Sequence, residues 1–149
     1  MPSDALENLA SIGLLDQVPF SRDLMNKMLT TAQLRLADSR RLENSLETRF
    51  DCAYTAIRAI ADAALLANSY RTLTSKPGHH QTTLQCLAHT LGVEIQVVRI
   101  LDGLRKQRNL SDYNGELITD QALNECIQQA LQLQELAKRK LTTTSDQNS

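Results

Sequence analysis

The segment formed by residues 50–67 constrains the fold most, because apolar residues cover most of its circumference if it is helical. A surface helix needs only one apolar face, whereas a helix that is apolar almost all round has to be buried. We therefore expect this segment to be the central helix of a bundle. One stripe comprises Phe50, Tyr54, Ile57, Ala61 and Leu65, and the adjoining face comprises Ala53, Ala56, Ile60, Ala63 and Ala67.

Helix-start and helix-stop signals divide the rest of the chain into segments that can surround this central helix. Ser21 and Thr119 are placed to cap helices. Asn44 followed by Glu47 predicts a boundary near residues 41–45, and a continuous, kinked helix through this segment is the alternative. The main helices are expected at residues 21–41, 45–71, 93–114 and 119–141, with shorter helices at 4–13 and 82–90.

These signals predict an all-α protein, an up-and-down antiparallel bundle of four main helices plus one or two short accessory helices. The chain has 149 residues, which suits a single domain with its own core. We assign residues 1–141 to that domain. Residues 142–149 are polar and lack helical periodicity, so we expect a disordered polar tail there.

The charge balance excludes some classes of function. There are 16 basic and 17 acidic residues, a formal net charge of −1, so the chain lacks the bulk positive charge of a dedicated duplex-DNA binder. No basic start followed by an apolar run and no long apolar stretch is present. We therefore expect no signal peptide, no membrane span and a cytoplasmic location.

The cysteines and histidines indicate neither a metal nor a cofactor. The three cysteines, Cys52, Cys86 and Cys126, are widely spaced within expected helices, which favours reduced core residues of a cytosolic protein. His79 and His80 precede a short helix, and no cysteine or carboxylate stands at ligand spacing beside them. We expect no bound metal and no cofactor.

The most unusual charged residue is Arg108, which falls on the apolar stripe of its helix with Val97, Ile100, Leu101 and Leu104. An arginine cannot lose its charge near neutral pH, so it needs an acceptor, a partner chain or an anionic ligand. The same end of the helix also carries other polar and aromatic residues, namely Arg105, Asn109, Asp112 and Tyr113.

Two interpretations of Arg108 remain open at this point. In the structural one, Arg108 pairs with Asp112, Asp51 or Asp62 and ties the bundle together. In the functional one, Arg108 supplies charge to a phosphate or RNA-backbone site. Asn109 and Tyr113 would then supply hydrogen bonds and stacking.

The run from Leu104 to Gly115, LRKQRNLSDYNG, resembles the terminal motif of HEPN domains, a superfamily of helical bundles common in bacterial toxin–antitoxin and defence systems. Upstream, RFDCAYTA at residues 49–56 and AALL at 63–66 are similar to the central small-residue helix of one small HEPN branch. A helix with an acidic start after a short loop also fits that branch. The resemblance spans residues 20–141, and its strongest parts are 49–71 and 104–137.

This resemblance implies a helical bundle that self-associates, commonly as a dimer. In ribonuclease members of the superfamily, an arginine is followed four to six residues later by a histidine, and the pair cleaves RNA across the dimer interface. Arg108 matches that arginine and Asn109 the polar residue beside it. Asp112 and Tyr113 stand where the histidine is expected, so no general acid–base imidazole follows Arg108.

We therefore expect a non-catalytic HEPN-like module that binds a partner protein or RNA, in a toxin–antitoxin-like or defence context. The expected binding residues are Arg105, Arg108, Asn109, Asp112 and Tyr113, and the sequence identifies no catalytic residue. The alternative is a metal-independent ribonuclease in which Asp112 or Tyr113 replaces the histidine. In a third interpretation the motif is structural and the function lies on a surface that the sequence does not mark.

Overall fold

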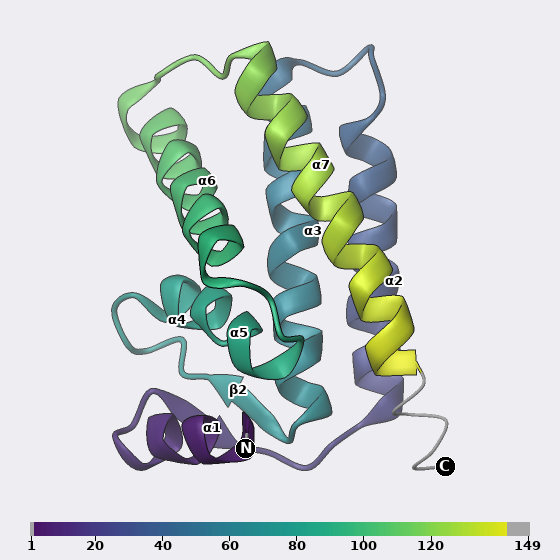
Figure 1. Cartoon of the computed structure of the whole chain (residues 1–149). Coiled ribbons are helices and arrows are strands. Elements are labelled where there is room, and N and C mark those ends of the chain that lie inside the picture. The colour runs from purple at the N-terminus through teal and green to yellow at the C-terminus, as the bar shows by residue number, and fades with distance from the viewer. Residues whose placement is uncertain (1, 143–149) are drawn as a thin grey trace.

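The structure is a computed structural model that describes residues 2–142, and most of this range is helical. Figure 1 shows long helices packed along one another, with shorter elements gathered at one end. The helices are α1 (Pro2–Ser11), α2 (Arg22–Ser39), α3 (Leu46–Ala67), α4 (His79–Gln85), α5 (Leu87–Thr90), α6 (Ile95–Asn114) and α7 (Asp120–Ala137), which continues into a π-helical turn, η1 (Lys138–Thr142).

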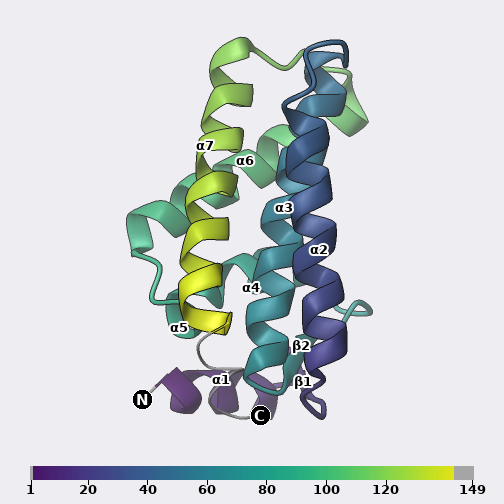
Figure 2. The ribbon, with the colours of Figure 1, turned by 90° about the vertical axis from the view of Figure 1, so that its right-hand side faces the viewer.

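The central position expected for the apolar helix is confirmed. Along α3, Ala53, Ala56, Ala63 and Ala64 are fully buried, and α3 packs most extensively against α2 and α7. Figures 1 and 2 show α2 and α7 along one side of α3, and α4 and α6 along the other. A helix covered on several sides needs apolar residues on most of them, which is why apolar residues cover most of the circumference of this segment.

The prediction of an entirely α-helical protein is wrong in one detail. A two-stranded antiparallel sheet pairs β1 (Leu15–Gln17) with β2 (Tyr70–Thr72), in the register Leu15 to Thr72. Strands of three residues are too short to show an alternating pattern, so they could not be recognised in the sequence. The sheet joins the segment after α1 to the end of α3, and Leu6, Leu15 and Tyr70 form a small second core beneath it.

Three of the four long helices start at a side-chain cap. The hydroxyl oxygens of Ser21, Ser45 and Thr119 each accept a hydrogen bond from the backbone N–H three residues later, which satisfies an otherwise unpaired donor. The predicted boundary near residues 41–45 is therefore confirmed, but Ser45 is the cap, rather than Asn44. Arg49 donates a 2.8 Å hydrogen bond to the carbonyl oxygen of Ser39, which ties the two sides of this break together.

The short helix expected at residues 82–90 is two helices, because the backbone turns at Cys86 between α4 and α5. Gly92 follows with a φ of 69°, the left-handed conformation that a glycine adopts cheaply at a helix end. Gly115 ends α6 in the same way, also with a φ of 69°.

The buried face of α6 keeps two of the four apolar residues expected there, Leu101 and Leu104, and adds Val98. Val98, Leu101 and Leu104 are buried, whereas Ile100 is 37% exposed and Val97 is half-buried. The last turns of the same face carry Arg105 and Arg108 in place of apolar residues. This half of α6 therefore meets α3 through charged side chains.

None of the helices within residues 2–142 is sufficiently long and apolar to traverse a lipid bilayer. The disordered tail expected at residues 142–149 falls, from residue 143 onward, outside the described residues.

Candidate functional site

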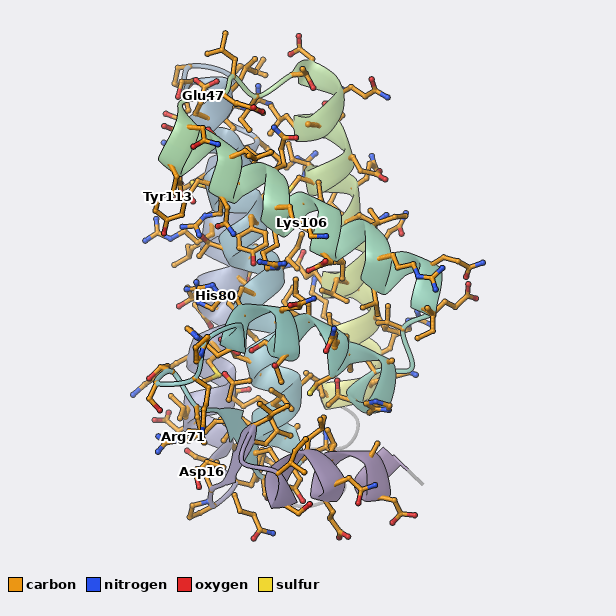
Figure 3. The ribbon with its side chains drawn as sticks, turned by 90° about the vertical axis from the view of Figure 1, so that its left-hand side faces the viewer. Asp16, Glu47, Arg71, His80, Lys106 and Tyr113 are labelled. Carbon is orange, nitrogen blue, oxygen red and sulfur yellow. The ribbon has the colours of Figure 1, made fainter. Side chains whose placement is uncertain are left out.

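The five residues singled out in the sequence lie on the last three turns of α6, but the structure treats them differently. The side chains of Arg105 and Arg108 are only 17% and 25% exposed, because they point toward the core side of the helix. Tyr113 is 83% exposed, and Figure 3 shows it projecting outward near the end of α6. The sequence placed them on one helix end, and the structure divides them into an inward and an outward group.

Arg108 is held by residues of two helices. Its Nε donates a 2.7 Å hydrogen bond to Oδ1 of Asp51 on α3, and lies 3.8 Å from Oδ2 of Asp112. The guanidinium carbon lies 5.4 Å from the centre of the Tyr54 ring, within reach of a cation–π interaction. Two of the three carboxylates considered for the structural interpretation are therefore partners of Arg108, and Asp62 is not.

The pKa of Arg108 reflects this arrangement. Burial lowers the pKa of Arg108, but the hydrogen bond and charge of Asp51, together with Asp112 and Tyr54, outweigh burial and raise it. The arginine is thus stabilised in its charged form at a site where desolvation alone would be unfavourable.

Arg105 and Lys106 share a different carboxylate. Nε of Arg105 donates a 2.8 Å hydrogen bond to Asp102, three residues earlier on α6, and Nζ of Lys106 lies 3.5 Å from the same carboxylate. Both pairs lie within α6, so they stabilise the helix rather than join it to α3. The exposed ammonium of Lys106 is visible on the outer side of α6 in Figure 3.

The structure adds two residues that the sequence had not identified as site residues, Arg58 and His80. Nη1 of Arg58 on α3 lies 3.2 Å from Nε2 of His80 on α4. Within residues 2–142, Arg58 has no carboxylate within ion-pair distance, unlike Arg105 and Arg108. No local pattern in the sequence marks this contact, because the two residues are 22 positions apart on different helices.

His80 is surrounded by positive charge. Burial lowers the pKa of His80 to about 4, with further lowering by Arg58, His79, Arg108 and Arg105. The imidazole is therefore neutral near pH 7, so Nε2 can accept the hydrogen bond that Arg58 donates.

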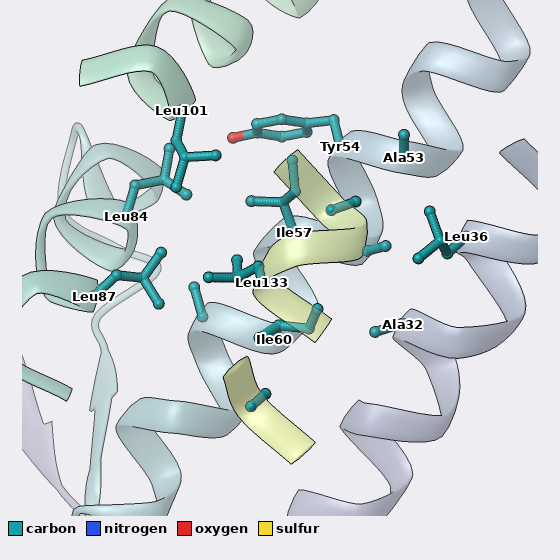
Figure 4. Close-up of a cluster of buried hydrophobic side chains, with 14 of the residues drawn as sticks. Ala32, Leu36, Ala53, Tyr54, Ile57, Ile60, Leu84, Leu87, Leu101 and Leu133 are labelled. Atoms are coloured by element: carbon teal, nitrogen blue, oxygen red, sulfur yellow. The ribbon is translucent and has the colours of Figure 1, made fainter. Parts of the chain in front are cut away.

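These contacts define a polar stripe on α3, formed by Asp51, Tyr54, Arg58 and Asp62, which repeat every three or four residues and face α4 and α6. Figure 4 shows the Tyr54 ring directed toward Leu84 of α4 and Leu101 of α6. The Tyr54 hydroxyl is buried and has no hydrogen-bond partner. Burial raises the pKa of Tyr54, although Arg58, Arg108 and Arg105 lower it.

Asp62 ends the polar stripe beside α4. Burial raises the pKa of Asp62 to about 6, although the charge of Arg58, a hydrogen bond from Thr83 and the charge of His79 all lower it. Desolvation therefore dominates at Asp62, whereas at Arg108 the opposite charges dominate.

Asn109 and Tyr113 contribute little to this network. Asn109 is half-buried, and neither side chain forms a hydrogen bond with another part of the described chain. Across residues 2–142, no three histidine, cysteine, aspartate or glutamate side chains gather closely enough to hold a metal ion.

Comparison with known proteins adds no assignment. No protein-family model matches the chain, and no curated protein matches it.

Proposed function

We propose that this chain is a non-catalytic helical binding module that acts through protein–protein contact. The partner we propose is a second copy of the same chain. One observation carries the proposal: the end of α6 presents large apolar side chains to solvent. Tyr113 is 83% exposed and Leu117 is 80% exposed. Leu42, which is 81% exposed, belongs to the α2–α3 connection at the same end of the molecule (Figure 1). We call Leu42, Tyr113 and Leu117 the apolar end.

Exposed apolar side chains are typical of interaction surfaces where they form a contiguous patch, and tyrosine is enriched among the residues that dominate interface energy. The apolar end is also firmly supported. Glu47 accepts a 3.3 Å hydrogen bond from the backbone N–H of Ile118, and Arg108 connects the last turns of α6 to Asp51. An interface built on a rigid support loses less conformational entropy when it forms.

The resemblance to HEPN domains suggests a biological setting for this binding module. In that context α2, α3, α6 and α7 are the four helices of an up-and-down bundle, the chain is a cytoplasmic homodimer, and its setting is a toxin–antitoxin or defence system. The resemblance of residues 104–115 to the HEPN terminal motif supports this context.

Sedimentation velocity over a range of protein concentrations tests self-association. We expect the wild-type chain to form dimers and the double variant Tyr113→Ala/Leu117→Ser to remain monomeric. Leu34→Ser is the matched control, because Leu34 is 61% exposed on α2, outside the apolar end. A monomeric wild-type chain, or equal weakening by the control, would contradict the proposal.

RNA binding is a second candidate, favoured by the three arginines Arg58, Arg105 and Arg108 beside a neutral His80. Arg105 and Arg108 are paired with carboxylates, whereas Arg58 has none within ion-pair distance in residues 2–142 and can contact phosphate, a contact that would weaken with salt. Fluorescence anisotropy with a labelled single-stranded RNA tests it. We expect Arg58→Gln to weaken binding, and Arg41→Gln, an exposed arginine of the α2–α3 connection, to leave it unchanged.

The ribonuclease alternative places Asp112 or Tyr113 in the role of the missing histidine. Asp112 lies 3.8 Å from the Arg108 guanidinium, and Tyr113 projects into solvent. Incubation of the same RNA with the chain in EDTA tests it, because cleavage that Asp112→Asn or Tyr113→Phe abolishes would support catalysis and overturn the non-catalytic proposal.

A further inference from the structure

A cavity at the opposite end of the molecule from the apolar end has the features of a ligand site. Its volume is about 300 Å³, and it lies between α2, the end of α3 and the two-stranded sheet. Small-molecule sites in proteins are typically hollows from roughly this size upward, with mostly apolar walls and a few polar groups that orient the ligand.

The walls of this cavity are mainly hydrocarbon. Val18 contributes from the segment after β1, Leu24 and Met28 from α2, and Leu66 from α3. Leu24 is 44% exposed, so the cavity opens to solvent on the α2 side. Walls of this kind favour a ligand with an apolar body.

One carboxylate, Asp62, lies in the wall of the cavity. The charge of Arg58, one turn earlier on α3, the hydroxyl of Thr83 and the charge of His79 on α4 act on this carboxylate. No arginine, lysine or histidine of the described chain lies within 4 Å of its oxygens. Arg71, which also lines the cavity, is paired with Asp16 at 3.2 Å on the exposed side of the sheet.

We propose that this cavity binds a small alkylammonium ion, with its ammonium group against Asp62 and its hydrocarbon part against Leu24, Met28 and Leu66. A buried carboxylate without an ion pair is unfavourable, and a cation that reaches it recovers the electrostatic stabilisation that water supplied before burial. An anionic ligand would meet the carboxylate directly, and a neutral ligand would leave it unpaired. This site is independent of the apolar end and of self-association.

Burial raises the pKa of Asp62 to about 6, which shows that its carboxylate has lost part of its stabilisation by water. A bound cation would favour the ionised form and lower this pKa again. The charged and titratable groups that face Asp62 are Arg58 on its own helix, His79 on α4 and Arg71 on β2.

Titrations followed by 1H–15N NMR test the proposal with three probes of equal chain length, namely n-hexylammonium chloride, n-hexanol and sodium hexanoate. Slightly above neutral pH, we expect hexylammonium to shift the backbone amides of Val18, Leu24 and Leu66 and to bind at least about tenfold more tightly than hexanol. Hexanoate should bind most weakly. Equal affinity of hexylammonium and hexanol, or shifts that map elsewhere, would overturn the proposal.

Two variants locate the effect. Asp62→Asn should reduce hexylammonium affinity to that of hexanol, whereas Asp23→Asn, which removes an exposed carboxylate of α2, should leave the difference intact. The wild-type chain supplies a measurement that depends on no variant. Its affinity for hexylammonium should fall when the pH is lowered through the pKa of Asp62, and should fall in the same way in His79→Gln. Affinity that is independent of pH, or tight binding by Asp62→Asn, would show that Asp62 is not the ammonium partner.

Discussion

The two sides of α3 pack against their neighbours through different kinds of side chain. The side toward α2 is lined by small apolar residues, and Figure 4 shows Ala53 opposite Leu36 of α2. The side toward α4 and α6 carries the polar stripe, Asp51, Tyr54, Arg58 and Asp62. Alanines let two helices approach closely, whereas charged side chains need partners and leave space between helices.

This difference separates the part of α3 that fixes the fold from the part that can change state. On the alanine side, burial and the charge of Asp38 on α2 raise the pKa of Cys52, so this thiol stays uncharged at neutral pH and the packing there responds little to pH. The polar stripe combines a carboxylate with a raised pKa, an imidazole with a lowered pKa and the Arg108 ion pair. Any response of this domain to its environment is therefore expected on the side of α3 that faces α4 and α6.

The largest expected effect comes from enlarging the alanine side. Ala56→Leu and Ala63→Leu should each lower the free energy of unfolding by about 1–3 kcal/mol, because both positions are fully buried and leave no room for added methylenes. Urea unfolding followed by circular dichroism measures the change. Ala37→Leu on the exposed face of α2 is the control, and an unchanged midpoint in both buried variants would show that this side is loosely packed.

Asp62→Asn tests the polar stripe, and we expect it to change the free energy of unfolding by nearly the same amount. The folded pKa of Asp62, about 6, lies above its ordinary value of 3.8, so ionisation of the folded protein is unfavourable. This destabilisation of the folded state is absent below pH 3.8. It grows as the pH rises from 3.8 to about 6 and is complete above about 6. Asp62→Asn should therefore raise the free energy of unfolding by about 2 kcal/mol at neutral pH and change it little at about pH 3.5.

Thermal or urea unfolding of Asp62→Asn at several pH values checks this sign. A variant that is destabilised equally at every pH would mean that Asp62 acts through its hydrogen bond with Thr83 rather than through its charge.

The Arg108 ion pair should contribute less. The Arg108 side chain is 25% exposed and that of Asp51 is 51% exposed, so water screens the pair in part. A double-mutant cycle with Arg108→Ala and Asp51→Ala should give a coupling energy of about 1 kcal/mol, smaller at high salt. A coupling near zero would leave Arg108 available to a ligand, whereas a coupling of several kcal/mol would identify it as a structural tie alone.

A smaller effect is expected at His80, because its imidazole is less buried than the Asp62 carboxylate and is screened more by water, and its sign is opposite to that of Asp62. The folded pKa of His80, about 4, lies below its ordinary value of 6.5. The stability that the neutral imidazole contributes is therefore present above pH 6.5 and is lost as the pH falls from 6.5 to about 4. Asp62 and His80 therefore offset each other in this window. His80→Gln should make the stability of the protein decrease more steeply as the pH rises from about 4 to 6. An identical pH profile for His80→Gln and the wild-type chain would contradict this compensation.

Local signals in the sequence determined the helices and their order. The hydroxyl caps at Ser21 and Thr119, the glycine after each of α5 and α6, and the all-round apolar pattern of α3 act within a few residues. Their effects can therefore be read without knowledge of the fold. The same logic placed Arg108 on an inward face, because a helical wheel needs only the sequence.

Which side chains those helix faces contact depends on how the helices pack against one another. The sequence offered Asp51, Asp62 and Asp112 to Arg108, and the crossing of α6 over the first half of α3 brought Asp51 rather than Asp62 to it, whereas Asp112 reaches Arg108 from the same helix. The contact of Arg58 with His80 joins residues 22 positions apart on different helices, and the cavity at Asp62 joins α2, α3 and β2. Burial, which sets the pKa of Asp62 and His80, depends on how all the elements pack together. No short stretch of sequence carries that information.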